Sequence, residues 1–252
     1  MGIAIAAAIL TLFAPYRKGF PMADRFFTEL PLAPGEFVLD GPEAHHMGTV
    51  RRFEPGDRVV LFNGDGGEYP AEIVSAGKKH VVLQVLEREE PRREVPFPIV
   101  VGSALPKGDR LDFLLEKLVE VGATRFVPLI AERSVVRPKV EKIEKWRRDV
   151  IEASKQCGRN TLMQIDKPMS LTEFLTSELP ERRFVLHTGN RGERSDPRRE
   201  GAAFAVGPEG GFTDGEIASA LAAGWRELSF GPRVLRVETA AVVAASWAAA
   251  GQ

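Results

Sequence analysis

The stretch Ala203-Phe-Ala-Val-Gly-Pro-Glu-Gly-Gly-Phe212 joins an apolar segment to a loop with three glycines. A helical pattern follows from Thr213 to Ala223, with Thr213 and Glu216 placed as an N-terminal capping box and Gly224 as the stop. A strand that passes through a glycine turn into a capped helix is the unit from which α/β sheets are built. This stretch therefore predicts a parallel sheet covered by helices.

The same alternation extends outward from this stretch, from Pro96 to the end of the chain. Short apolar runs predict further strands at Ile99–Leu105, Phe126–Ile130, Phe184–His187 and Leu228–Phe230. Helical spacing predicts helices at Leu111–Val119, Lys139–Cys157 and Thr239–Ala250. Alternating strands and helices indicate a mostly parallel sheet with both faces covered.

The N-terminal part has a different texture, with short β-type runs between Gly, Asn and Asp turns. The predicted strands are 36–39, 58–62, 68–74 and 80–86, and one helix is expected at Glu43–Phe53. This pattern is typical of a small barrel or sandwich. A charged stretch with two prolines, Glu87–Pro96, separates it from the α/β part. We expect one domain over residues 22–90 and a second over residues 97–252.

Composition limits the possible classes of protein. The 252 residues are 44% apolar and 27% charged, the balance of a globular chain and not of a disordered, collagen-like or multi-span membrane protein. The single cysteine excludes an internal disulfide, and the adjacent His45 and His46 do not have a usual metal-ligand spacing, so we expect no metal. Residues 22–96 hold nine Lys and Arg against fourteen Asp and Glu, a net charge of −5.

Residues 1–21 do not fit either domain. The apolar run Ile3–Phe13 is too short to span a bilayer, and the charges of Arg17 and Lys18 follow it, whereas those of a signal peptide precede the apolar run. We expect an N-terminal extension with Met22 as the true start, and the alternative is an uncleaved apolar tail.

Three segments are expected at the carboxyl ends of the strands, where open α/β sheets bind ligands. They are Leu186–Gly189, Val206–Phe212 and Phe230–Ala240. No Gly-x-Gly-x-x-Gly opens a helix after a strand, and no phosphate-binding P-loop is present. Taken alone, the glycine loop could be a tight turn, and Arg236 with Glu238 could be an ion pair at the start of the last helix. Cys157 fits packing better than a nucleophilic role.

Several ordered motifs resemble those of the RsmE-type 16S ribosomal RNA uracil-N3 methyltransferases of the SPOUT superfamily. In the C-terminal half they are Val206–Phe212, Gly231–Arg236, Glu238–Ala240, Ala104–Lys107, Glu132–Ser134 and Gln156–Asn160. In the N-terminal half they are Arg25–Phe27, Glu43–Met47, Val50–Arg52 and Pro55–Asp57. The resemblance covers nearly the whole chain from Arg25, and residues 1–21 lie outside it.

The resemblance implies a PUA-like RNA-binding β-barrel over residues 22–90 and a SPOUT methyltransferase domain over 97–252. It also implies a deep trefoil knot, which patterns alone would not suggest because knots are very rare. A cytoplasmic homodimer, not attached to a membrane, would bind S-adenosyl-L-methionine and methylate N3 of one uridine in 16S rRNA of the small ribosomal subunit. The implied cofactor-binding residues are Leu186, His187, Gly189, Gly207, Pro208, Glu209, Gly210, Gly211, Leu228, Phe230, Gly231, Leu235 and Thr239.

Methyl transfer to uracil N3 creates negative charge on the base oxygens as the N3 proton leaves, so a cation and a base are expected nearby. We expect Arg236 to be the cation and Glu209 or Glu238 to be the base or an orienting group. The expected RNA-binding residues are Arg25, Arg51, Arg52, Lys107, Arg133, Arg159 and Asn160, with Arg110 and Arg137 beside them. Arg51 and Arg52 could instead only solvate a helix end.

Other functions remain open from the sequence. One is a SPOUT methyltransferase that acts on another RNA nucleotide. A second is a catalytically inert RNA-binding homologue, and a third is an α/β enzyme that uses a different nucleotide.

Overall fold

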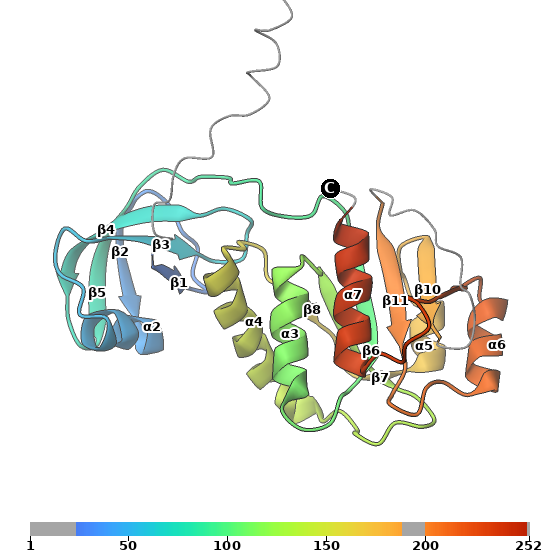
Figure 1. Ribbon diagram of the computed structural model, residues 1–252. Coiled ribbons are helices and arrows are strands. Elements are labelled where there is room, and N and C mark those ends of the chain that lie inside the picture. Colours follow the sequence, from blue (N-terminus) through green and yellow to red (C-terminus); the bar gives the residue numbers. More distant parts are fainter. Residues whose placement is uncertain (1–23, 188–199, 251–252) are drawn as a thin grey trace, which may run out of the picture. The chain divides into compact units, whose positions relative to one another are not determined.

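The computed structural model describes residues 24–187 and 200–250 (Figure 1). The chain folds into two compact units. Among the described residues, one unit holds 24–63 together with Glu68–Glu89, and the other holds Gly64–Gly67 together with 90–187 and 200–250. The predicted extension at residues 1–21 and the proposed start at Met22 lie outside the described residues.

The first unit is built on a five-stranded sheet in the order β1-β3-β4-β5-β2. Its strands are β1 (Arg25–Phe27), β2 (Gly35–Asp40), β3 (Arg58–Phe62), β4 (Tyr69–Ala76) and β5 (His80–Val85). The sheet curls around alternate side chains that form one core, among them Leu39, Leu61, Ile73 and Leu83 (Figure 1). Four of these strands match the prediction. β1, which pairs parallel with β3, was not predicted, because three residues are too few to show a period.

The single helix expected at Glu43–Phe53 is in fact two pieces. An α-helical turn, α2 (Gly41–His45), continues into the π-helix η1 (His46–Val50). A Cβ atom on Gly48 would lie 2.4 Å from the carbonyl oxygen of Gly77, so only glycine allows this segment to lie against the β4–β5 turn. The segment ends at Val50 with Arg51 as its C-cap, and the next residue, Arg52, has a φ of 54°, which is unfavourable for a residue with a side chain.

The second unit holds a fully parallel sheet in the order β12-β10-β11-β6-β7-β8, with β9 also paired to β7. The strands are β6 (Ile99–Ala104), β7 (Arg125–Ile130), β8 (Gln164–Ile165), β9 (Met169–Ser170), β10 (Arg182–Leu186), β11 (Ala202–Val206) and β12 (Arg226–Leu228). β6 and β11 are buried along their whole length, because helices cover both faces of the sheet.

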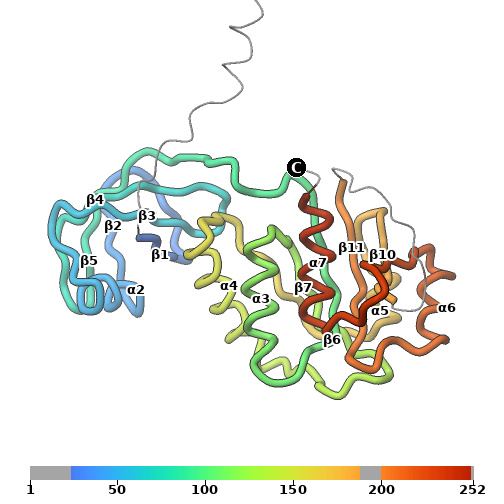
Figure 2. The backbone as a smooth tube through the Cα atoms, viewed as in Figure 1, coloured from blue at the N-terminus to red at the C-terminus, as the bar shows by residue number. Residues whose placement is uncertain are grey.

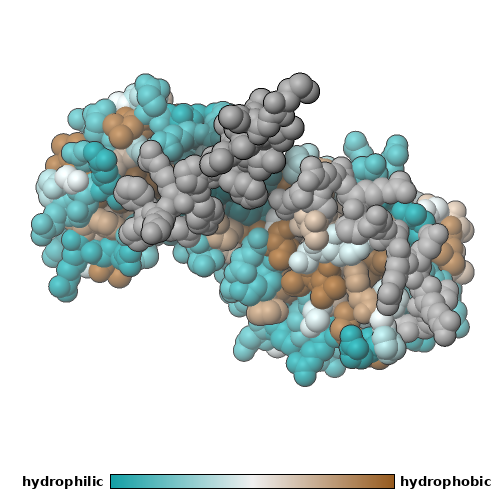
Figure 3. All heavy atoms as spheres, turned by 45° about the horizontal axis from the view of Figure 1, so that its top comes forward, coloured by the Kyte–Doolittle hydropathy of each residue, from teal (hydrophilic) through white to brown (hydrophobic). Residues whose placement is uncertain are grey.

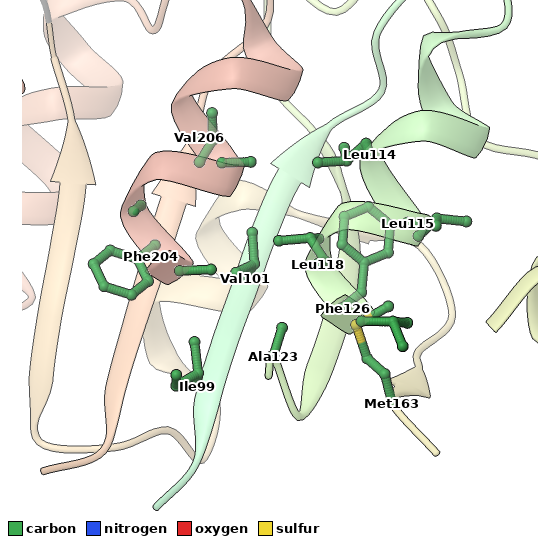
Figure 4. Packing of buried hydrophobic residues seen from close by; sticks show 14 of the residues in the cluster. Ile99, Val101, Leu114, Leu115, Leu118, Ala123, Phe126, Met163, Phe204 and Val206 are labelled. Atoms are coloured by element: carbon green, nitrogen blue, oxygen red, sulfur yellow. The ribbon is translucent and has the colours of Figure 1, made fainter. Parts of the chain in front are cut away.

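Helices α3 (Arg110–Glu120), α4 (Ile143–Cys157) and α7 (Val237–Ala249) pack on one face of this sheet. Figure 4 shows Leu114 and Leu118 of α3 directed toward β6, where Val101 belongs to the same core cluster. On the other face lie α5 (Leu171–Thr176) and α6 (Asp214–Ala222). A short 3-10 turn, η2 (Val140–Lys142), leads into α4. The predicted α/β fold is confirmed, as is the capping box of α6, in which Thr213 and Glu216 bond reciprocally.

Two details of the second unit differ from the prediction. The last strand is Arg226–Leu228 and not Leu228–Phe230, because Glu227 and Leu228 pair with β10 and the chain then leaves the sheet. The short elements β8, β9 and α5 were not predicted, since each is too short to show a hydrophobic period. The trefoil knot depends on the path of residues 188–199, which lie outside the described residues, and it stays a prediction.

Within the described ranges, no helix has both the length and the apolar character that crossing a membrane requires. On the face shown in Figure 3 the first unit is mostly hydrophilic, whereas the second also shows an apolar area.

Candidate active site

A pocket of about 320 Å³ lies at the carboxyl ends of β12, β10 and β11, three neighbouring parallel strands. Its wall consists of the residues that follow each strand: 186–187, 206–212 and 228–235, apart from Pro232. Val237 and Ala240 of α7 complete it. Figure 2 shows the red C-terminal segment running from one of these loops directly into α7. The sheet therefore brings together the three loops that the sequence singled out.

The pocket loops need glycine at two positions. Gly211 has a φ of 68° and closes a turn in which its N–H donates to the carbonyl of Pro208 at 2.8 Å. Gly231 has a φ of 109°, a conformation that L side chains rarely adopt. Because no side chain stands at these positions, the backbone itself forms part of the wall and can approach a bound molecule closely.

Glu209 and Glu238 are joined through a third residue, Arg110, at the start of α3. The Arg110 guanidinium lies 3.8 Å from Oε1 of Glu209 and 3.5 Å from Oε1 of Glu238. Glu209 lines the pocket and is about one-third exposed, whereas the side chain of Glu238 is only 7% exposed and does not line the pocket. The two carboxylates therefore have different environments, although one guanidinium serves both.

Arg133 holds the glycine loop from another direction. Its Nη1 donates to the carbonyl of Gly210 at 2.9 Å, and its side-chain carbons lie 3.5 Å from where a Cβ of Gly210 would stand. The backbone N–H of Glu132, the preceding residue, donates to the carboxylate of Glu216, the capping residue of α6. The segment after β7 is thus tied both to the loop and to the helix that follows the loop.

Arg236 is exposed and is the N-cap residue of α7. Among the residues that the structure describes, neither its guanidinium nor that of exposed Arg233 has a hydrogen-bond or ion-pair partner. The alternative that Arg236 pairs with Glu238 is therefore wrong, because Arg110 takes that place. Two available guanidinium groups stand on the loop that leads into α7, and Arg233 belongs to the pocket wall.

His187 follows β10 and lines the same pocket. Its Nδ1 lies 3.8 Å from Oε2 of Glu227 on β12, and its backbone N–H donates to the carbonyl of Leu228 at 3.3 Å.

Most of the predicted cofactor-binding residues line this pocket. They are Leu186, His187, Gly207, Pro208, Glu209, Gly210, Gly211, Leu228, Phe230, Gly231 and Leu235. Thr239 does not line it, because it lies on the exposed side of α7, and Gly189 falls outside the described residues. The pocket is also lined by residues that the predicted cofactor-binding set does not name one by one, although they fall in or beside the predicted loops: Val206, Phe212, Ser229, Arg233, Val234, Val237 and Ala240.

Three of the predicted RNA-binding residues are buried. Arg25 pairs with Glu68 at 2.7 Å and lies over the ring of Phe62. Arg159 pairs with Glu94 at 2.8 Å and also donates to the carbonyls of Val119 and Ala123. Asn160 beside it is 3% exposed. The two arginines bond to the protein itself, and none of the three residues is exposed to solvent, which corrects their expected place on an RNA surface.

The other predicted RNA-binding residues are exposed. Arg51 pairs with Asp24 at the surface, while Arg52 and Lys107 have no hydrogen-bond or ion-pair partner for their side chains within the described ranges. Arg133 is exposed, although its guanidinium is engaged by the Gly210 carbonyl.

The fold and the site define the class of protein. A family model described as an RNA methyltransferase domain matches residues 93–249, and a second, described as an RNA methyltransferase PUA domain, matches residues 39–86. The second unit has a SPOUT-type parallel sheet and the first a PUA domain with a curled sheet.

Named relatives define the family further. The chain is 32% identical to ribosomal RNA small subunit methyltransferase E of Bacillus subtilis, over 88% of this chain and 94% of the relative. It is also 32% identical to the Synechocystis protein of the same name, over 90% and 77% of the two chains. The protein belongs to the ribosomal RNA small subunit methyltransferase E family, a family of RNA methyltransferases.

Two solved structures have the same fold. A putative methyltransferase from Legionella pneumophila, in complex with S-adenosylmethionine, is 33% identical with a TM-score of 0.83, over 90% of this chain and 97% of that one. Ribosomal RNA small subunit methyltransferase E from Neisseria gonorrhoeae, bound to S-adenosyl methionine, is 30% identical with a TM-score of 0.82, over 89% and 95%.

Proposed function

We propose that this protein transfers a methyl group from S-adenosyl-L-methionine to N3 of a specific uridine in 16S rRNA of the small ribosomal subunit. The observation that carries this proposal is a glycine-walled pocket at three adjacent strand ends with available guanidinium groups on the adjoining loop. Membership of the family and the cofactor bound in two structural relatives support it.

The pocket residues fit the cofactor. A volume of about 320 Å³ lies at the small end of the range for small-molecule sites. Loop amides at 207–211 and 228–231 would bind its polar groups, and Leu235 with Pro208 would flank the adenine. When bound, the cofactor supplies an electrophilic methyl group on a positively charged sulfur.

The chain's own residues would prepare the uracil. Arg236 would stabilise the negative charge that develops on the base oxygens, because a guanidinium stays protonated and offers a fork of donors. Glu209 would accept the hydrogen bond of N3–H and receive or orient its proton. We give Glu209 this role in preference to Glu238, because Glu209 lines the pocket and Glu238 does not.

The RNA would contact separate cationic points. We propose Arg51, Arg52 and Lys107, together with Arg133 and Arg236 near the pocket, because all five are exposed. The first domain is net negative, so it does not attract RNA over a long range. An assembled small subunit suits such a surface, since shape and several local contacts can act together. We also propose a cytoplasmic homodimer, in line with the family resemblance.

The test has two parts. Isothermal titration calorimetry of the purified protein with S-adenosylmethionine should give saturable binding. Nucleoside mapping of small-subunit RNA from cells that lack this gene should show loss of N3-methyluridine at one site, restored by complementation. A different missing nucleoside would assign the protein to another RNA target, and absence of cofactor binding would make it an inert RNA-binding homologue.

A further inference from the structure

Arg110 lies between the two carboxylates Glu209 and Glu238, and the proposed reaction gives it no role. It is the first residue of α3, shortly after the carboxyl end of β6. Its Nη1 and Nη2 face Glu238 and Glu209, and its Nε donates to the carbonyl of Lys107 at 3.0 Å. One guanidinium therefore connects the glycine loop after β11 with the first turn of α7.

Glu238 needs such a partner. Its side chain is 7% exposed, and its Oε2 atom is buried without a hydrogen-bond partner among the described residues. A buried carboxylate is costly unless a cation compensates it. Within the described ranges, Arg110 is the one residue that forms an ion pair with Glu238.

Arg236 is the neighbouring guanidinium that could compete for Glu238. It stands two residues earlier in the chain, and its backbone is extended, with a φ of −66° and a ψ of 157°. Its side chain is exposed and makes no ion pair in the described part of the chain. Arg236 stays available while Arg110 neutralises Glu238.

We infer that Arg110 is a positioning residue that keeps Arg236 available for the RNA substrate by neutralising Glu238, and that also holds Glu209 at the pocket rim. This inference rests on the proposed function, since it assigns Arg236 to the substrate. It predicts a specific failure: without Arg110, the buried carboxylate of Glu238 attracts Arg236 away from the uracil.

The experiment is a cycle of Arg110→Ala, Glu238→Gln and the double variant. Each is assayed on small subunits from cells lacking the gene, together with cofactor affinity by calorimetry. Arg110→Ala should lower kcat roughly 100-fold, the scale of a misplaced catalytic group, with the cofactor Kd within about threefold of wild type. The kcat of Glu238→Gln alone should stay within about threefold of the wild-type value. The double variant should recover at least about tenfold of the lost kcat, because neutral Gln no longer attracts Arg236.

A merely structural role of Arg110 would not give this recovery. A double variant as slow as Arg110→Ala would overturn the inference, and so would an inactive Glu238→Gln. An equal loss of kcat and cofactor affinity in Arg110→Ala would also overturn it. Arg110→Lys serves if Arg110→Ala does not fold, since one ammonium cannot fork to both carboxylates and should give an intermediate kcat. The control Arg147→Ala removes an exposed ion pair with Glu144 on α4 and should change neither kcat nor the cofactor Kd.

A crystal structure of Arg110→Ala separates this inference from the proposed function. The guanidinium of Arg236 should lie within ion-pair distance of Glu238 in that structure, and an unchanged Arg236 would overturn the inference. Absence of methylation by the wild-type protein would instead defeat the proposed function. The position of the Arg236 guanidinium in the Arg110→Ala structure would then still test whether Arg110 keeps Arg236 away from Glu238.

Discussion

The two glycine loops of the pocket, 207–211 and 230–236, differ in where the arginines that surround them come from. The 207–211 loop is held from outside by two guanidinium groups, Arg110 through Glu209 and Arg133 through the Gly210 carbonyl. The 230–236 loop carries its own arginines, Arg233 and Arg236, and neither has a partner among the described residues. Arginines from elsewhere in the chain therefore hold the 207–211 loop in place, whereas the 230–236 loop carries positive charge that is available to a ligand.

This difference separates two uses of the same residue type. Committed arginines, defined here as Arg25, Arg110 and Arg159, bond to the protein itself. Available arginines, defined as Arg52, Arg233 and Arg236, have no hydrogen-bond or ion-pair partner for the side chain in the described residues. Substitution of a committed arginine should act on stability or geometry, whereas substitution of an available one should act on substrate handling.

The largest effect is expected for Arg236→Ala. We expect kcat to fall by roughly 10²–10³-fold, the usual cost of removing one group that stabilises developing charge. Cofactor affinity and stability should stay at wild-type values, measured by calorimetry and thermal unfolding. Arg233→Ala is the matched control on the same loop and should lose much less turnover. Equal losses in the two variants, or equal losses of affinity and turnover in Arg236→Ala, would contradict the assignment.

Arg159→Ala should be the most destabilising change among the committed arginines of the second unit. It removes the guanidinium that pairs with Glu94 and donates to the carbonyls of Val119 and Ala123, at a cost of about 3 kcal/mol in the free energy of unfolding. All three tryptophans, Trp146, Trp225 and Trp247, belong to the second unit, so tryptophan fluorescence during urea unfolding reports on that unit. A midpoint equal to that of wild type would show that Arg159 is not structural.

Gly231→Ala should destabilise the 230–236 loop by about 1–2 kcal/mol, because a side chain is forced into a positive-φ conformation. Cofactor affinity should fall with it. Gly210→Ala provides the control on the 207–211 loop, since its Cβ would make ordinary contacts of 3.5 Å with Arg133. Urea unfolding and calorimetry compare the two variants, and a tolerated Gly231→Ala would mean that the loop does not need this backbone conformation.

Arg52→Ala tests the available arginine of the first unit. We expect rRNA affinity to fall modestly, with the slope of log K against log salt reduced by about one, as for the loss of one phosphate contact. Stability should not fall, because the side chain is exposed and its removal leaves no partner unpaired among the described residues. An unchanged salt slope would assign Arg52 to solvation of the helix end.

The smallest effect is expected at Cys157. Burial raises the pKa of its thiol above the ordinary value, so less thiolate is present at neutral pH and the group should react slowly. Alkylation by iodoacetamide at neutral pH should be slow in the folded protein and should accelerate in urea. Cys157→Ser should retain methylation activity, and loss of activity would contradict the packing role.

Several parts of the site could be predicted from the sequence because their causes are local. The capping box of Thr213 and Glu216 needs only a spacing of three residues, and it forms as predicted. The carboxyl ends of parallel strands share one edge, so the loops after β10, β11 and β12 had to meet. The π-helix at His46–Val50 was not predictable, since Gly48 packs against Gly77 of the β4–β5 turn and such a contact between distant residues leaves no local pattern.

The periodicity of apolar residues and the glycine turns determined, from sequence alone, the α/β sheet and the edge at which its pocket forms. Which arginines face solvent was decided only by the tertiary structure. Arg25 and Arg159 read as surface cations in sequence, yet each is buried against a carboxylate that only the fold brings near. Glu238 likewise pairs with distant Arg110 and not with nearby Arg236, because burial of a charge depends on three-dimensional neighbours and leaves no local pattern.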